Sequence, residues 1–304
     1  MIRMVFAVVL AVFAAAPIAA QERSYLGYGY LFTNDFLGDG KDRWRTGSYQ
    51  SSRFWGSDTT GPAPDRFGQL LELRIGGEII APEELGRVVP GDRPYAGVLS
   101  FGLHTHFSTG DYQTSAGVDL SFTGSQTRLD SFQSSLHDVF GAPDLSSAVR
   151  DQQIGDDFHP SLALETARSF DLSARTQLRP YVEGRLGLEN LLRLGADLRI
   201  GALGRDAVMS RDTVTGHRYQ VGRQDGQGAA FILGADVAYV DDSELLPENR
   251  GIELSEDRTR IRSGVQWQTA QGFSGFYGLT WLSEEFDGQR EGQVVGSLRL
   301  NFSF

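Results

Sequence analysis

The 304-residue sequence has no cysteine, few prolines and, after residue 20, no apolar run as long as a membrane-spanning helix. The lack of cysteine excludes a disulfide scaffold, a thiolate zinc site and cysteine catalysis. Basic residues are also scarce, since 28 Lys and Arg stand against 39 Asp and Glu and give a formal net charge of -11. Non-specific binding to nucleic acid needs a basic face that displaces counterions. We therefore expect no nucleic-acid partner.

Glycine and aromatic residues are well represented, with 37 glycines and 11% aromatics, and this composition suits an all-β protein. The N-terminus is distinctive. Arg3 is the only charged residue among the first 20, an apolar core follows it, and the small residues Ala19 and Ala20 precede Gln21. This pattern predicts a secretory signal peptide over residues 1–20 and an exported domain over 21–304.

Hydrophobic residues alternate with polar ones along much of the mature chain. In 176–186, for example, Leu178 and Val182 lie on one face, and Arg179 and Glu183 lie on the other. Such strands are roughly 9–11 residues long and carry charges on one face, whereas soluble sandwiches have shorter strands around an apolar interior. A transmembrane barrel has apolar side chains toward lipid and polar side chains toward the lumen. The alternation therefore favours an all-β, closed antiparallel transmembrane β-barrel.

Twelve strands are expected, and this even number places both termini in the periplasm. Tight turns are predicted at the periplasmic end, although the connection 202–228 is longer than this pattern expects. No internal repeat or interdomain linker is visible. The expected strands cover residues 24–33, 43–53, 66–76, 95–107, 112–122, 159–170, 175–186, 192–201, 229–240, 258–269, 273–283 and 292–304.

A short helix is predicted inside the outward connection 123–158. Leu129, Phe132, Leu136 and Phe140 recur at helical spacing and form one apolar stripe. His137 borders this stripe, so we expect it at the edge of the buried face of the helix, where it could form the wall of an active site. The alternative is a surface helix with an incidental histidine, which the pattern alone favours.

Several polar residues stand at the predicted outer ends of strands. Asn34 and Asp35 follow the first strand, where Asn-Asp is an ordinary turn signal. The same pair could supply hard oxygen ligands to a divalent cation or hold an oxyanion. Arg93 lies in a Pro-bounded segment that leads into the fourth strand. The sequence contains no Gly-x-Ser-x-Gly nucleophile elbow, which favours direct attack by water over a serine nucleophile.

Together, four segments resemble the lipid A deacylase family of outer-membrane proteins, which removes the 3′-linked acyloxyacyl chain. The segment Asp92-Arg93-Pro94-Tyr95-Ala96-Gly97 is the most specific of them. The resemblance spans most of the mature chain. The other three segments are Asn34-Asp35-Phe36 with Asp42-Arg43-x-x-Thr46-Gly47, Gln133-x-x-x-His137-x-x-x-Gly141, and Glu285-Phe286-x-x-Gln289.

The resemblance implies a twelve-stranded barrel whose active site lies between the barrel wall and a loop helix near the outer leaflet. His137 would match the family's histidine base, and Asn34 and Asp35 its early polar pair, with Asp35 linked to a required calcium ion. Thr46 would match a hydroxyl residue of the second strand. The family usually has a carboxylate shortly after the histidine, and Asp144 is the nearest one here.

The function expected from these residues is hydrolysis of an ester of lipid A in the bacterial outer membrane. His137 would activate water, calcium on Asp35 would polarise the carbonyl, and Asn34 would stabilise the oxyanion. Arg43 and Arg93 are candidates for binding the anionic headgroup of the lipopolysaccharide. We expect a monomer. The alternatives are an outer-membrane phospholipase and a non-enzymatic barrel, either a narrow pore or an inactive family member.

Overall fold

A computed structural model describes residues 23–56, 63–205, 207–222 and 227–301. The expected signal peptide 1–20 and the terminal Phe304 lie outside this part of the chain. All twelve expected strands are present, with ends that differ by a few residues. They are β1 (Ser24–Asn34), β2 (Trp44–Gly56), β3 (Leu70–Ala81), β4 (Ala96–Thr109), β5 (Tyr112–Thr123), β6 (Asp157–Arg168), β8 (Thr176–Leu186), β9 (Glu189–Ile200), β12 (Gly228–Ser243), β13 (Asp257–Gln268), β14 (Ser274–Leu282) and β15 (Gln293–Asn301).

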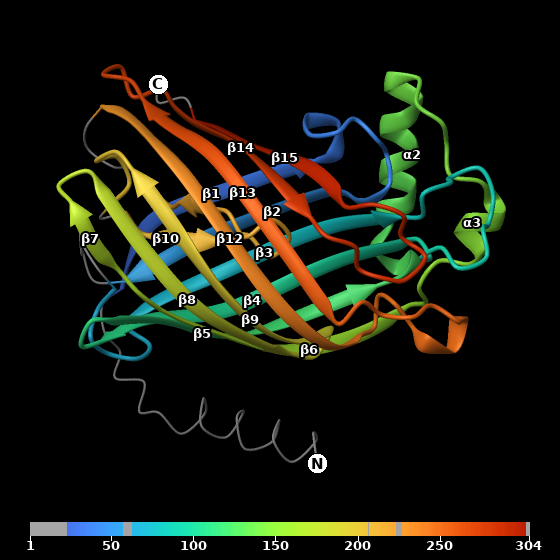
Figure 1. Cartoon of the computed structure of the whole chain (residues 1–304), viewed down its shortest axis with the longest axis horizontal. Helices are drawn as coiled ribbons and strands as arrows, with labels where there is room; N and C mark the ends of the chain where they lie inside the picture. The colour runs from blue at the N-terminus through green and yellow to red at the C-terminus, as the bar shows by residue number, and fades with distance from the viewer. Residues whose placement is uncertain (1–22, 57–62, 206, 223–226, 302–304) are drawn as a thin grey trace, which may run out of the picture.

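The strands form a closed antiparallel barrel (Figure 1). Each strand pairs with the next along the chain, β6 pairs with β8, and β1 closes the cylinder against β15. Closure satisfies the backbone hydrogen bonds of every strand, which a hydrocarbon environment requires. The predicted fold class is therefore confirmed.

The alternation of the sequence corresponds to the two faces of the barrel wall. In β12, Phe231, Leu233 and Val237 are exposed on the outside, whereas Ile232 and Asp236 between them are buried inside. This is the pattern of a wall with lipid on one side and a polar lumen on the other. Within the described ranges, no helix has the length and hydropathy of a membrane span.

The two ends of the barrel differ. At one end, tight turns such as Gly110-Asp111 join neighbouring strands. Longer connections at the other end contain α2 (Leu129–Phe140) and α3 (Ser147–Asp151), together with the short 3-10 helices η1 (Asp35–Leu37), η2 (Ser125–Thr127) and η3 (Glu248–Arg250). Figure 1 shows α2 and α3 beyond the rim at this end. Outer-membrane barrels have short turns in the periplasm and long loops outside, so the helices belong to the outer end.

The long connection 202–228 folds back into the lumen. It contains the hairpin of β10 (Met209–Arg211) and β11 (Arg218–Gln220), and the short β7 (Phe170–Ser173) extends the sheet beside β8. The hairpin packs against the inside of β1, where a Cβ on Gly29 would lie 2.3 Å from the Gln220 carbonyl oxygen. Only glycine leaves room for this approach.

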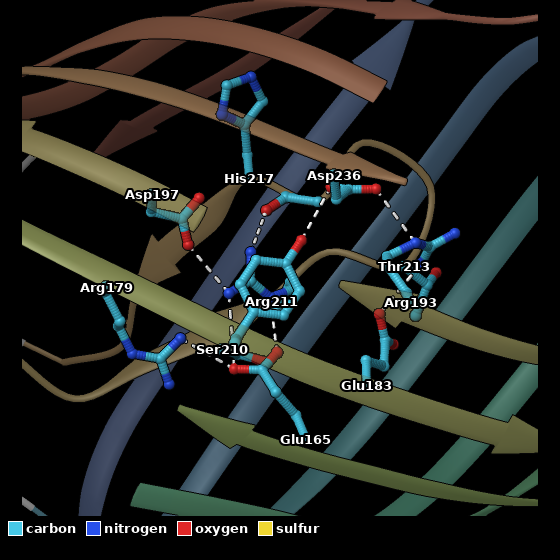
Figure 2. A network of polar contacts seen from close by, with 12 residues as sticks. Glu165, Arg179, Glu183, Arg193, Asp197, Ser210, Arg211, Thr213, His217 and Asp236 are labelled. Atoms are coloured by element: carbon cyan, nitrogen blue, oxygen red, sulfur yellow. Dashed lines mark hydrogen bonds and ion pairs between the residues drawn. The ribbon is translucent and has the colours of Figure 1, made fainter. Parts of the chain in front are cut away.

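Charged side chains fill the lumen around the hairpin (Figure 2). Asp236 is fully desolvated and accepts hydrogen bonds from Arg260 Nε at 2.8 Å and from the Tyr181 hydroxyl at 2.8 Å. It also contacts Arg262, and Arg193 Nε lies 3.1 Å from it. The carboxylate therefore holds together three arginines from two strands, β9 and β13.

Replacing Asp236 with alanine should destabilise the barrel by about 3–5 kcal/mol, because three buried arginines would lose their shared counter-charge. The measurement is urea unfolding of the protein folded into lipid vesicles. Asp241→Ala, which removes an exposed carboxylate from the same strand, is the matched control. A loss below about 1 kcal/mol for Asp236→Ala would contradict the importance assigned to this carboxylate.

Candidate active site at the outer rim

Asn34 fixes the geometry where β1 ends and η1 begins. Its side-chain oxygen accepts a hydrogen bond from the Phe36 backbone N–H at 2.9 Å and so caps η1. Its amide nitrogen donates to the Thr46 carbonyl on β2 at 2.9 Å. The turn interpretation of this asparagine is thus correct. One of the two amide N–H groups remains outside these contacts.

Asp35, the next residue, is buried beneath the outer rim and is only 3% exposed. Its Oδ2 accepts a hydrogen bond from the Arg43 backbone N–H at 3.1 Å. Burial raises the pKa of the Asp35 carboxyl to about 7, a hydrogen bond with Thr46 opposes this rise, and the negative charge of Asp42 adds to it. A positive charge beside Asp35 and Asp42 would relieve their repulsion.

Asp42 joins the first hairpin to the loop helix. Its Oδ1 accepts hydrogen bonds from the Thr46 hydroxyl at 2.6 Å and from Gln133 Nε2 on α2 at 3.2 Å. Its Oδ2 lies 3.0 Å from Nε2 of His137, an ion-pair distance, but makes no hydrogen bond. Residues 42, 46, 133 and 137 therefore meet at one point of the rim.

His137 is held from its other side by the chain that follows α2. Gly141 ends the helix with a left-handed φ of 71°, and the chain then turns back on itself. The Pro143 carbonyl accepts a hydrogen bond from His137 Nδ1 at 2.6 Å. This contact places a proton on Nδ1 and leaves Nε2 directed at Asp42.

Asp144, the nearest carboxylate in sequence after the histidine, has other partners. Its Oδ1 accepts hydrogen bonds from the Ser134 hydroxyl at 2.6 Å and from the Leu145 backbone N–H at 2.7 Å. The carboxylate beside the His137 ring is Asp42, from the first hairpin. This contact joins segments far apart in the chain, so local spacing could not identify it.

The helix α2 spans the predicted residues, but its orientation was predicted wrongly. Its buried side chains are Asp130 and Gln133, whereas Phe132 is 54% and Phe140 is 80% exposed. The polar face packs on the barrel rim because it has hydrogen-bond partners there. The apolar stripe faces outward, as on a helix that borders lipid. His137 thus lies on the inward, polar side.

The oxygen atoms of this site suit a hard divalent cation. Gln133 Oε1 and Asp42 Oδ2 are buried and accept no hydrogen bond, and the Asp35 carboxylate is close enough to Asp42 to be affected by its charge. Carboxylate and amide oxygens are the ligands that calcium prefers. In the part of the chain that the structure describes, no group of three or more His, Cys, Asp and Glu side chains is arranged to hold a metal ion.

The two candidate headgroup arginines have different surroundings. Arg93 is 2% exposed and forms an ion pair with Glu285, so its guanidinium is directed into the barrel. Arg43 stacks on the Trp44 ring at 3.8 Å and pairs with Glu83 at 3.2 Å and Glu291 at 2.7 Å. Of the two arginines, Arg43 is the nearer to solvent through its exposed partner.

The family model described as "Outer membrane protein LpxR" matches residues 4–304. The chain belongs to the LpxR family. It is accordingly an outer-membrane protein, in agreement with its closed barrel. No curated protein matches the sequence significantly.

Solved structures give the same architecture for this LpxR-family barrel. LpxR from Salmonella typhimurium superposes with a TM-score of 0.72 at 16% identity, covering 91% of this chain and all of that one. The β domain of the Bordetella autotransporter BrkA matches with a TM-score of 0.44 at 11% identity, covering 91% and 99% of the two chains. The first likeness supports the fold, and the second carries no further argument.

In the LpxR-family barrel, the expected residues Asn34, Asp35, Thr46 and His137 lie at one part of the rim. Tyr95, which the sequence analysis did not single out, belongs beside them. Its hydroxyl is buried without a hydrogen-bond partner, and burial together with nearby carboxylates raises its pKa. Its position immediately before β4, within the most specific motif, was the signal that could have identified it.

Proposed function

We propose that the protein is a lipid A deacylase, an ester hydrolase that removes the 3′-linked acyloxyacyl chain in the outer leaflet. The observation that carries this proposal is the contact of His137 with Asp42 at the outer rim, on the polar face of a helix whose apolar face points outward. A base beside a lipid-facing surface suits an enzyme whose substrate ester lies at the membrane boundary.

His137 is the proposed general base. Its Nδ1 proton is engaged by the Pro143 carbonyl, so Nε2 is the nitrogen that can take a proton from an attacking water. The Asp42 carboxylate, 3.0 Å from Nε2, stabilises the positive imidazolium that results. Thr46 and Gln133 hold this carboxylate in place, so we assign them positioning roles.

Negative charge develops on the carbonyl oxygen of the ester during attack. Asn34 is proposed to donate its remaining amide N–H to this oxygen, a type of contact worth about 3–4 kcal/mol in other enzymes. Asp35, with Asp42 and Gln133 Oε1, would hold calcium, which when bound supplies positive charge for polarising the carbonyl. The chain's own carboxylates would then be fully ionised.

Arg43 is the proposed contact for the anionic headgroup of the lipopolysaccharide. Its carboxylate partner Glu291 is largely exposed, so a phosphate could compete for the guanidinium. Arg93 is better suited to fixing the rim through Glu285, because both side chains are buried. We also propose that the protein acts as a monomer, because all of these groups come from a single chain.

The apolar face of α2 should position the rim at the lipid surface. Replacing Phe132 and Phe140 singly by serine should each lower deacylation of lipid A in vesicles by about tenfold, because each ring loses roughly 1.5–3 kcal/mol of burial in lipid. Hydrolysis of a dispersed short-chain ester should change less than about twofold. Asp138→Ser, at an exposed position of the same helix, is the control. Equal losses on both substrates would contradict a membrane-contacting role.

Mass spectrometry of lipid A from cells that express the protein tests the proposed function. The expected result is loss of the mass of the 3′-linked acyloxyacyl group. Unchanged lipid A with cleaved glycerophospholipids would indicate the phospholipase alternative. Unchanged lipids of both kinds, with the folded barrel present in the outer membrane, would indicate a non-enzymatic barrel.

Calcium removal should abolish the activity of the purified enzyme. A chelator should lower the rate by about 10²-fold or more, since the carbonyl would lose its Lewis acid and the Asp35–Asp42 repulsion would return. Added calcium should restore the rate in the wild type but not in Asp35→Asn. A chelator-resistant rate would contradict the cation site and leave His137 as the remaining part of the mechanism.

A further inference from the structure

The lumen contains a cavity of about 200 Å³ toward the short-turn end, away from the outer rim. Its lining comes from the inward faces of the barrel strands and from the hairpin β10–β11. Arginines dominate the charged side chains of this lining, and two histidines and two glutamates accompany them. The charged and histidine residues are Arg74, Arg179, Arg185, Arg205, Arg211, Arg218, His104, His106, Glu165 and Glu183.

The hairpin register places two arginines side by side at this cavity. Arg211 on β10 is the cross-strand partner of Arg218 on β11, and like charges directly opposite each other destabilise a strand pair. Arg211 has strong compensation. It donates to Glu165 at 2.6 Å and Asp197 at 2.9 Å, and its guanidinium stacks on the Tyr181 ring at 3.7 Å. Figure 2 shows Arg211 between Glu165 and Asp197.

Arg218 has weaker compensation, because Asp197 and Glu165 attract it without forming a direct ion pair. Over the described ranges, its guanidinium has no hydrogen-bond or ion-pair partner, and Arg179 and Arg211 are close enough to repel it. Arg179 donates to Glu165 at 2.9 Å through Nη1, but its Nε–H is buried without a partner. Glu165 is thus shared by two arginines and has little capacity left for a third.

The nearby glutamate cannot supply the missing charge either. Glu183 accepts from Arg185 Nε at 2.6 Å and from Arg193 Nη1 at 3.0 Å, so it too is shared by two guanidiniums. Removing a charge from water is costly unless a nearby opposite charge compensates for it. Among the described side chains that line the cavity, guanidinium groups outnumber carboxylates, and Arg218 is left without a direct ion pair.

We propose that this cavity binds a small tetrahedral oxyanion, of which inorganic phosphate is the probe, between Arg218 and the Nε–H of Arg179. Guanidinium groups bind phosphate oxygens through paired N–H donors. Because these donors are held in a fixed plane, little conformational entropy is lost on binding. The cavity volume admits such an anion together with water. The site is separate from the proposed deacylase site, since its residues lie at the opposite end of the lumen.

Isothermal titration of the folded, mature barrel in detergent with inorganic phosphate tests this proposal, with sodium chloride as the ionic-strength control. The wild type should bind one phosphate per barrel. Arg218→Gln should weaken binding at least tenfold, and Arg218→Lys, which retains the charge but not the paired donors, about three- to tenfold. The matched control is Arg175→Gln, which removes an exposed arginine at the same end.

Unfolding temperatures provide a second readout. Phosphate should raise the unfolding temperature of the wild type and of Arg175→Gln but not of Arg218→Gln. If Arg218→Gln does not fold, Arg218→Lys carries the comparison. Absence of phosphate binding by the wild type, or equal affinity in the wild type and the Arg218 variants, would overturn the proposal. Deacylase activity should stay unchanged in Arg218→Gln, so neither outcome depends on the proposed function.

Discussion

His137→Ala should lower the rate of lipid A deacylation by about 10²–10⁴-fold, the usual contribution of a general base. Alanine removes the only ring nitrogen that the structure directs at Asp42, and no other histidine contacts this group of residues in the described chain. The measurement is the initial rate on lipid A in mixed micelles with calcium, quantified by mass spectrometry of the released acyl chain.

The matched control for this substitution is His159→Ala. His159 lies near the start of β6, and its ring contacts the Thr123 hydroxyl at 3.3 Å instead of a carboxylate. Its loss should leave the rate within about twofold. Heat-dependent mobility on gels verifies that both variants are folded. A wild-type rate in His137→Ala would keep the activity but discard the base assignment.

Asp42→Asn should lower the rate of deacylation by about 10–100-fold. The neutral amide cannot stabilise the imidazolium of His137, and it weakens the oxygen set shared with Asp35. The loss should appear chiefly in kcat, because the imidazolium forms only during the reaction. Calcium titration of the variant should also show weaker activation.

Asp144→Asn tests whether Asp42 or Asp144 is the carboxylate that supports His137. Sequence spacing alone favours Asp144. Because Asp144 accepts from Ser134 and from the Leu145 backbone instead of His137, its amide variant should keep the rate within about twofold. A large loss in Asp144→Asn together with an unchanged rate in Asp42→Asn would reverse the two roles.

The barrel could be predicted from the sequence because its signal is local. In each strand, side chains alternate between lipid and lumen. The amino-acid sequence of a stretch such as 176–186 therefore alternates between apolar and polar residues. Closure and antiparallel order then follow from strand number and length, and the loop helix follows from the helical spacing of its apolar residues. Strand ends shifted by a few residues because turn residues at the rims do not alternate.

The parts that could not be predicted depend on contacts between distant segments. The hairpin β10–β11 is too short to show a period, and its position is set by buried pairs such as Arg211 with Glu165. The stripe of Phe132 and Phe140 was assigned to a protein core, since periodicity identifies an apolar face but not whether protein or lipid covers it. The contact of Asp42 with His137 could not be predicted either, because only the folded barrel brings the first hairpin beside α2.

The inward-folded hairpin also affects the bore of the barrel. A twelve-stranded cylinder is wider than the eight-stranded barrels whose interiors side chains just fill, so an empty interior would admit water and ions. Here Arg211, Tyr219 and their partners occupy the bore from one side to the other. The bore of this membrane-spanning cylinder is therefore crossed by the protein's own side chains and not left as an open water-filled channel along the hairpin.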